Sequence, residues 1–364
     1  MNRIQSVDIF RLLGIVAVIA IHTSPFMLDS PSENELYKYL SVIINQLARF
    51  AVPFFFVISG YFWGAKVRNG SSPISSALKM SSRILVLFLA WCIVYLIPYN
   101  SVFTAFYDHG VLGPIKVVYW NISELIQHPL TLIMQGTKVH LWFLIGLIFS
   151  IGISAIFIHK QWIKSLIFLS LLLYVIGVLA KAYTNTPIGI TIEFNTRNGP
   201  FFGTLFFVSG YLMSGFTANA KWLNYGILVF LLGCIAHFSE IYVLWSMYGT
   251  SPKQDFVLGT YFMGVGVAMA SLSNHPALQN KMLSKIGQMT LGIYAVHFIY
   301  VDLFRGIDEN IYSPFWEMSY VMLVLVLSVL SSILLSKNKI TRKLVVVESG
   351  SRGFFSPGSL PRMA

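Results

Sequence analysis

The segment DIFRLLGIVAVIAIH, residues 8–22, carries an Asp, an Arg and a His in a stretch that is otherwise apolar enough to enter a membrane. An α-helix turns 100° per residue, so Arg11 and His22, eleven positions apart, lie within about 20° of each other around the axis. Asp8 precedes Arg11 by three residues, which is the spacing of a side-chain pair on one helix face. The segment therefore predicts a membrane helix whose three polar side chains share one face.

The same helix separates these groups along its axis. A rise of 1.5 Å per residue places His22 roughly 16 Å beyond Arg11, more than half the thickness of a bilayer core. Titratable side chains are costly in hydrocarbon and usually mark a functional site. A structural interpretation is also open, in which Asp8 and Arg11 mark the membrane surface and His22 makes a structural hydrogen bond. We expect His22 to be functional.

The composition is that of a multi-pass membrane protein. The 364 residues are 56% hydrophobic and only 11% charged, with a mean hydropathy of +0.70, whereas soluble domains carry about 25% charged residues. The apolar residues form continuous runs, which excludes the alternating pattern of a membrane β-barrel. Cys92 and Cys234 lie inside such runs without metal-ligand spacing, so we expect neither a disulfide framework nor a metal site.

The apolar runs predict ten transmembrane helices in an all-α bundle. They cover residues 7–28, 40–64, 80–98, 139–158, 163–181, 197–216, 222–245, 256–273, 286–304 and 315–336. The side that holds the N-terminus then has 17 Lys or Arg and two acids, and the opposite side has seven Lys or Arg and 11 acids. The positive-inside rule therefore predicts that both termini are cytoplasmic. Because topology explains the net charge of +11, we expect no nucleic-acid partner.

The segments outside these spans are also characteristic. Residues 117–134, between the third and fourth spans, are apolar but interrupted by Glu124 and Pro129, which predicts an interfacial or re-entrant helix. Residues 1–336 are predicted to form one transmembrane domain. Residues 337–364 are predicted to be a cytoplasmic tail that begins basic and ends disordered.

Two segments repeat Ser-Gly-Tyr after a run of aromatic residues. They are PFFFVISGYF (53–62) and GTLFFVSGYLM (203–213). Ser and Gly allow membrane helices to approach closely, so we favour small-residue packing over a true internal repeat.

Further polar side chains gather in the predicted outer half of the bundle. They are Arg49, His140, Arg197, His237, Glu240 and His297. Each one alone is consistent with an interfacial anchor or a hydrogen bond between helices. Together they concentrate polar groups on the side of the membrane toward which His22 points.

A family resemblance rests on blocks that follow one another along the chain. After residues 8–22 come ARFAVPFFFVISGYFW (48–63), HLWFL (140–144), RNGPFFGTLFFVSGYL (197–212) and LGIYAVHFIY (291–300). The first helix adds an Arg and a His separated by ten residues. Together with this pair, the blocks resemble the acyltransferase family 3 membrane enzymes, and the resemblance extends to about residue 336. Among them the chain is most similar to the stand-alone enterobacterial-common-antigen O-acetyltransferase group.

The resemblance implies a multi-pass protein of the bacterial inner membrane that O-acylates, usually O-acetylates, a cell-surface or lipid-linked saccharide. Acetyl-CoA would be the cytoplasmic donor substrate, with no bound cofactor. His22 corresponds to the family's essential histidine, as base or acyl carrier. Arg11 corresponds to its essential basic residue, and with Asp8 it would meet the phosphates of coenzyme A. The candidates for the acceptor pocket or a relay are Arg49, His140, Arg197 and His297.

Transport is the alternative function. Residues 140–142 (HLW) and 196–199 (TRNG) also resemble the membrane half of vancomycin-resistance serine racemases, which is thought to move serine. Because no racemase domain accompanies these helices in the sequence, acylation is the favoured expectation. A polysaccharide-export partner without chemistry would leave Arg11 and His22 unexplained.

Overall fold

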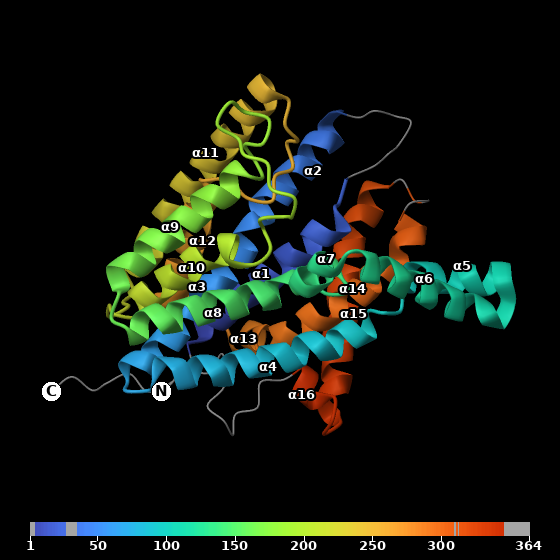
Figure 1. Cartoon of the computed structure of the whole chain (residues 1–364), viewed down its shortest axis with the longest axis horizontal. Helices are drawn as coiled ribbons and strands as arrows, with labels where there is room; N and C mark the ends of the chain where they lie inside the picture. The colour runs from blue at the N-terminus through green and yellow to red at the C-terminus, as the bar shows by residue number, and fades with distance from the viewer. Residues whose placement is uncertain (1–3, 27–34, 309–310, 312, 346–364) are drawn as a thin grey trace.

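The structure is a computed structural model that describes residues 4–26, 35–308, 311 and 313–345, and all regular elements in these ranges are helices. The α-helices are α1 (Gln5–Thr23), α2 (Glu35–Leu47), α3 (Ala51–Arg68), α4 (Pro73–Val94), α5 (Tyr99–His109), α6 (Gly113–Gln127), α7 (Pro129–Gln135), α8 (Trp142–His159), α9 (Ile163–Leu179), α10 (Pro200–Met213), α11 (Trp222–Tyr248), α12 (Thr260–Leu272), α13 (Lys281–Gly287), α14 (Thr290–Asp308), α15 (Pro314–Lys337) and α16 (Arg342–Val345). Most of them form one bundle, from which α5 and α6 extend at one end (Figure 1). The predicted all-α class is confirmed for this part of the chain.

Six helical segments of the described chain are long and apolar enough to cross a membrane. They are Gln5–Thr23, Glu35–Arg68, Pro73–Val102, Val139–His159, Trp222–Tyr248 and Pro314–Lys337. Helices α13 and α14 meet the criterion only as a pair, which is bent by 64°. The shorter apolar helices α9, α10 and α12 overlap the three remaining predicted ranges. The fold is therefore that of a multi-pass membrane protein, while the count of ten spans and the side of the termini stay predictions.

Helix α1 is buried among other helices rather than at the edge of the bundle. It packs against α3, α12, α13, α14 and α15. Asp8 and Arg11 are buried on it, at 2% and 6% exposure. The polar face that the sequence predicts thus points into the protein, as expected for charged groups that are costly to expose to lipid.

The two Ser-Gly-Tyr segments belong to α3 and α10, which run in the same direction and pack closely on each other. Gly60 lies against the backbone of Phe207, and reciprocally Gly210 lies against the backbone of Val57. A Cβ atom on either glycine would overlap a carbonyl oxygen of the facing helix. The two glycines allow the close approach that the small-residue interpretation predicts.

Replacing Gly60 with alanine is therefore expected to destabilise the detergent-purified protein. An overpacked contact lowers the free energy of unfolding by about 1–3 kcal/mol or more, which lowers the melting temperature. Gly152 of α8 is a suitable control, because a Cβ atom added there would have no neighbour within 4 Å. Thermal melting of the two variants measures the difference. Equal melting temperatures for Gly60→Ala and Gly152→Ala would contradict this account of the α3–α10 contact.

The predicted interfacial segment 117–134 is divided between α6 and α7, with a break at His128 before Pro129. Exposed aromatic side chains on α5 and α6 include Tyr107 at 90% and Tyr119 at 68% exposure. Such residues suit a membrane interface, where an aromatic ring meets both water and lipid. The place of these helices relative to a membrane stays a prediction.

The predicted tail begins where α15 ends at Lys337, and α16 forms part of its basic start. Residues 346–364, which contain its predicted disordered end, lie outside the described residues. The same holds for residues 27–34, which include the end of the first predicted span.

Candidate active site

The predicted polar face of α1 holds an ion pair at one end and His22 in the last turn at the other. Arg11 donates to Asp8 at 3.0 Å, and the Ser284 hydroxyl of α13 donates to the other carboxylate oxygen at 3.0 Å. The Arg11 guanidinium also lies over the ring of Phe62, 5.6 Å from its centroid. Asp8 therefore fixes Arg11 inside the bundle, close to α3 and α13.

At the other end of α1, His22 meets two further histidines. Its ring centroid lies 5.5 Å from that of His297 on α14 and 6.5 Å from that of His140, which sits in the short 3₁₀ turn Val139–Leu141 before α8. The His140 and His297 rings are 5.1 Å apart. His140 and His297 are buried, at 2% and 0% exposure, whereas His22 keeps partial exposure. These three residues, called the histidine cluster below, come from positions 118 or more residues apart in the chain.

Hydrogen bonds to the backbone set the protonation of one of these rings. The Nδ1 atom of His297 lies 2.7 Å from the carbonyl oxygen of Tyr294. A carbonyl oxygen only accepts, so Nδ1 carries a proton, and in the neutral ring Nε2 then keeps its lone pair. The hydroxyl of Tyr294 donates to the carbonyl oxygen of His140 at 2.6 Å, which ties the turn before α8 to α14.

Several ring nitrogens of the cluster have no hydrogen-bond partner among the described residues. They are Nδ1 and Nε2 of His140 and Nε2 of His297. Buried polar atoms are rarely left unpaired in native proteins, and such exceptions often belong to catalytic sites. No three His, Cys, Asp or Glu side chains of the described chain are arranged to hold a metal ion. The cluster is therefore suited to accept or pass a proton.

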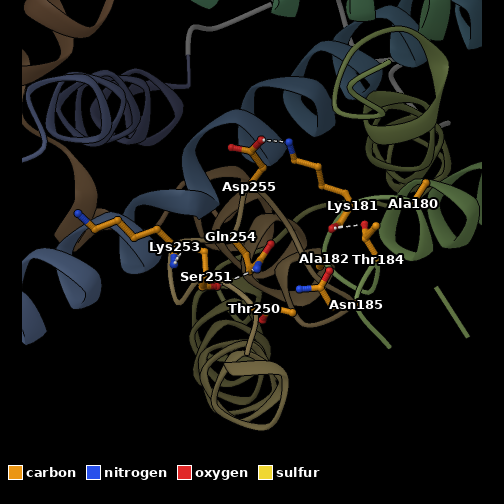
Figure 2. Close-up of a pocket in the computed structure, with 10 residues that line it drawn as sticks. All are labelled: Ala180, Lys181, Ala182, Thr184, Asn185, Thr250, Ser251, Lys253, Gln254 and Asp255. Carbon is orange, nitrogen blue, oxygen red and sulfur yellow. Dashed lines mark hydrogen bonds and ion pairs between the residues drawn. The ribbon is translucent and has the colours of Figure 1, made fainter. Parts of the chain in front are cut away.

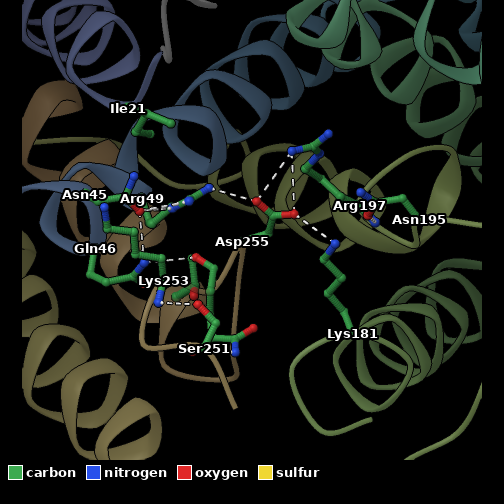
Figure 3. Close-up of polar contacts among 12 residues, drawn as sticks. Ile21, Asn45, Gln46, Arg49, Lys181, Asn195, Arg197, Ser251, Lys253 and Asp255 are labelled. Carbon is green, nitrogen blue, oxygen red and sulfur yellow. Dashed lines mark hydrogen bonds and ion pairs between the residues drawn. The ribbon is translucent and has the colours of Figure 1, made fainter. Parts of the chain in front are cut away.

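A second group of charges surrounds Asp255, in the connection between α11 and α12 (Figure 3). Its carboxylate receives Arg49 at 3.0 Å, Lys181 at 3.2 Å and Arg197 at 3.4 Å. Burial alone would raise the pKa of Asp255, but the charges of Arg197, Arg49 and Lys181 outweigh it and lower that pKa below its usual value. Asp255 is thus ionised at neutral pH and holds three cations together; this group is called the charge cluster below.

The charge cluster adjoins the histidine cluster. Arg197 lies over the ring of Trp142, 5.1 Å from its centroid, and Trp142 follows His140 by two residues. Arg49, Arg197 and Asp255 are also close enough to His22 to interact with it electrostatically. Arg49 lies in a 3₁₀ turn (Ala48–Phe50) that breaks the predicted span 40–64 between α2 and α3.

The structure thus groups the predicted residues into three sets. The first set is His22 with His140 and His297. The second set is Asp255 with Arg49 and Arg197. The third set is the pair of Asp8 and Arg11, at the opposite end of α1 from His22.

Charged residues near these sites that the sequence did not single out include Lys138, Lys181, Asp255 and Asp302. Lys138 forms an ion pair with the buried Asp302, and its amino group lies 4.9 Å from the ring centroid of Phe298, which stacks on His140. Asp302 offered a signal, because it is an acid inside the predicted span 286–304. Lys138, Lys181 and Asp255 lie at span ends or in connections, where a charge is ordinary.

Two other polar residues of the predicted outer half have structural partners. His237 lies between Thr260 and the side chain of Gln46, at 3.0 Å from each. Glu240 accepts hydrogen bonds from the backbone N–H groups of Leu258 and Gly259, at 2.9 Å each. Both residues therefore fix the connection that carries Asp255.

In the part of the chain that the structure describes, the protein is an all-helical multi-pass bundle whose interior holds imidazole nitrogens without a partner. These features define the class as a membrane protein with an internal polar site. Residues 4–337 match the family model described as "Acyltransferase domain". The chain belongs to this acyltransferase family, as the sequence blocks predict. The family supports an acyl-transferring enzyme, with the histidine cluster as its candidate active site.

The chain is also similar to proteins of enterococci. An amino-acid racemase of Enterococcus faecalis is 24% identical over 96% of this chain and 49% of the relative. A serine/alanine racemase of Enterococcus gallinarum is 28% identical over 80% of this chain and 40% of the relative. The chain thus spans half or less of the curated relatives it matches. No solved structure matches it.

Proposed function

We propose that this protein is an O-acyltransferase of the bacterial cytoplasmic (inner) membrane. It transfers an acetyl or other acyl group from cytoplasmic acyl-CoA to a hydroxyl of a cell-surface or lipid-linked polysaccharide. The observation that carries the proposal is the meeting of His22, His140 and His297 inside a bundle of the acyltransferase family. Ring nitrogens of His140 and His297 have no partner among the described residues. A sugar hydroxyl is a weak nucleophile at neutral pH, and acyl transfer to it needs a base of this kind.

The transfer has a direct route. An imidazole nitrogen accepts the proton of the sugar hydroxyl while the hydroxyl oxygen attacks the thioester carbonyl. The new C–O bond forms and the C–S bond breaks. The coenzyme A thiolate leaves and takes up a proton. In an alternative two-step route, His22 first takes the acyl group from the thioester and then passes it to the hydroxyl. His297 suits a proton relay behind His22 in either route, because the Tyr294 carbonyl holds the proton of its ring on Nδ1.

Arg11 and Asp8 supply the donor side of the proposal. Arg11 would meet a phosphate of coenzyme A, for which a guanidinium has suitable bidentate geometry. The Asp8 carboxylate, bonded to Arg11 and Ser284, would hold the guanidinium in position. Since Arg11 and His22 are roughly 16 Å apart along α1, the pantetheine arm or an acyl carrier would bridge that distance.

Radiolabelled acetyl-CoA and the purified protein in liposomes test the function. With a bacterial membrane glycan fraction as acceptor, we expect base-labile acetyl label to appear on the glycan together with release of coenzyme A. Without the acceptor, label that stays on the protein indicates the two-step route, and unlabelled protein indicates the direct route. Absence of both glycan label and coenzyme A release in the complete reaction would contradict acyl transfer.

The second candidate function is transport of a small solute. It is supported by the racemase names of the similar enterococcal proteins, although the chain spans only part of them. Uptake of labelled serine into the same liposomes, without any acetylation of the glycan fraction, would favour transport.

A further inference from the structure

A pocket of about 430 Å³ lies next to the charge cluster, a volume within the range of small-molecule sites. It is formed by residues 180–185, after α9, and residues 250–255, after α11 (Figure 2). Its side chains include Lys181, Lys253 and Asp255. By the charge pattern of the sequence, this end of the bundle is predicted to face outward.

The pocket and the residues behind it carry more positive than negative charge. Lys181, Arg49 and Arg197 all share the carboxylate of Asp255. A fourth cation, Lys253, donates to the neutral hydroxyl of Ser41 at 2.9 Å. The group therefore contains four cations and one carboxylate, which pairs with three of them.

This surplus lies in a partly buried place, where water screens charge poorly. The side chains of Arg49 and Arg197 are only 13% and 15% exposed. Burial and then the charge of Arg49 lower the pKa of Lys253. Like charges gathered in a cleft create a positive potential that favours an anionic ligand.

The rest of the lining suits a polyhydroxylated ring. Hydroxyl and amide side chains provide donors and acceptors; they are Thr184, Asn185, Thr250, Ser251 and Gln254. The Thr250 hydroxyl is buried, with the residue 7% exposed, and has no partner among the described residues. Because a buried polar atom without a partner is costly, a ligand in the pocket that reaches this hydroxyl gains a hydrogen bond.

We propose that this pocket binds an acidic sugar of the acceptor glycan, with the anionic group of the sugar attracted by the surplus of positive charge to which Lys181 and Lys253 contribute. The inference rests on the proposed acyltransferase function and adds the substrate class. Arg197 connects the two sites, because it bonds to Asp255 beside the pocket and lies over Trp142 beside the histidine cluster. A sugar held by its charge in the pocket would place neighbouring units of the glycan near His22.

Direct binding to the full-length protein in nanodiscs tests the pocket without any acyl transfer. The probes are glucuronate, glucose 1-phosphate, glucose and serine, measured by calorimetry. We expect glucuronate or glucose 1-phosphate to bind at least 10-fold more tightly than glucose, and the tighter of the two identifies carboxylate or phosphate as the anionic group.

The variants Lys181→Gln and Lys253→Gln are each expected to weaken binding of the acidic sugar about 10-fold, the loss of one charge-assisted hydrogen bond. Lys221→Gln, an exposed lysine before α11, is the matched control and should bind like wild type. Lys181→Arg should keep the preference, which separates loss of charge from misfolding.

Equal binding of glucose and the acidic sugars would overturn the proposal, as would full affinity in Lys181→Gln and Lys253→Gln. Tighter binding of serine than of either acidic sugar would also overturn it and favour transport. Acidic-sugar binding without acetyl transfer would leave the pocket assignment standing and refute the proposed function. Acetyl transfer to the glycan by a protein that binds glucose as tightly as the acidic sugars would support the proposed function and refute the pocket assignment.

Discussion

Replacing His22 with asparagine is expected to lower the rate of acyl transfer by about 100- to 10,000-fold, the usual contribution of a positioned general base. Asparagine keeps polar character at a position that is partly exposed, but it cannot accept a proton at neutral pH. His22 is also the member of the histidine cluster with partial exposure, so it is the one a substrate reaches. Release of coenzyme A from acetyl-CoA in the presence of the glycan fraction measures the effect.

The control for this prediction is a histidine outside the histidine cluster. His159, exposed at the end of α8, is replaced by asparagine in the same assay and should leave the rate unchanged. The melting temperature of His22→Asn should stay near that of the wild type, because no element depends on the ring for a hydrogen bond within the described chain. A folded His22→Asn variant with the wild-type rate would exclude His22 as base and as carrier.

The part of the site that lies on one helix could be predicted from the sequence. Helical periodicity alone placed Asp8, Arg11 and His22 on a common face, and the structure confirms both that face and the Asp8–Arg11 pair. The helical character of the long apolar runs could be predicted for a similar reason, since such runs in a membrane have few alternatives to a helix. The acyltransferase family was identified from blocks near these helices, and the match to residues 4–337 confirms it.

The convergence of residues from different helices could not be derived from periodicity. His140 and His297 are separated by 157 positions, and only the packing of α14 beside the turn before α8 brings them within 5.1 Å. The role of Asp255 was harder to predict, because the residue lies in a connection between helices, where a carboxylate is common. Its role depends on Arg49, which a 3₁₀ turn in the second predicted span places against α1 and α12 and beside Asp255.

The strongest structural effect is expected from removal of the Asp255 carboxylate. Asp255→Ala leaves Arg49, Arg197 and Lys181 without their shared anion, in a place where the Asp255 side chain itself is only 17% exposed. Loss of one partner from a buried ion pair lowers the free energy of unfolding by about 3–5 kcal/mol. Because Lys181 is partly exposed, we expect a loss near the lower end of that range. Thermal melting in detergent should show a clear decrease, whereas Asp108→Asn, at an exposed acid on α5, should melt like wild type.

A second substitution separates charge repulsion from a general loss of packing. If the destabilisation of Asp255→Ala comes from three cations that repel one another, then Asp255→Ala combined with Arg197→Gln should melt at a higher temperature than Asp255→Ala alone. Residues in direct contact typically show such coupling, because each substitution changes the environment of the other. If the double variant instead melts lower than Asp255→Ala, Asp255 stabilises the fold by packing, and the charge cluster is not held together by its carboxylate.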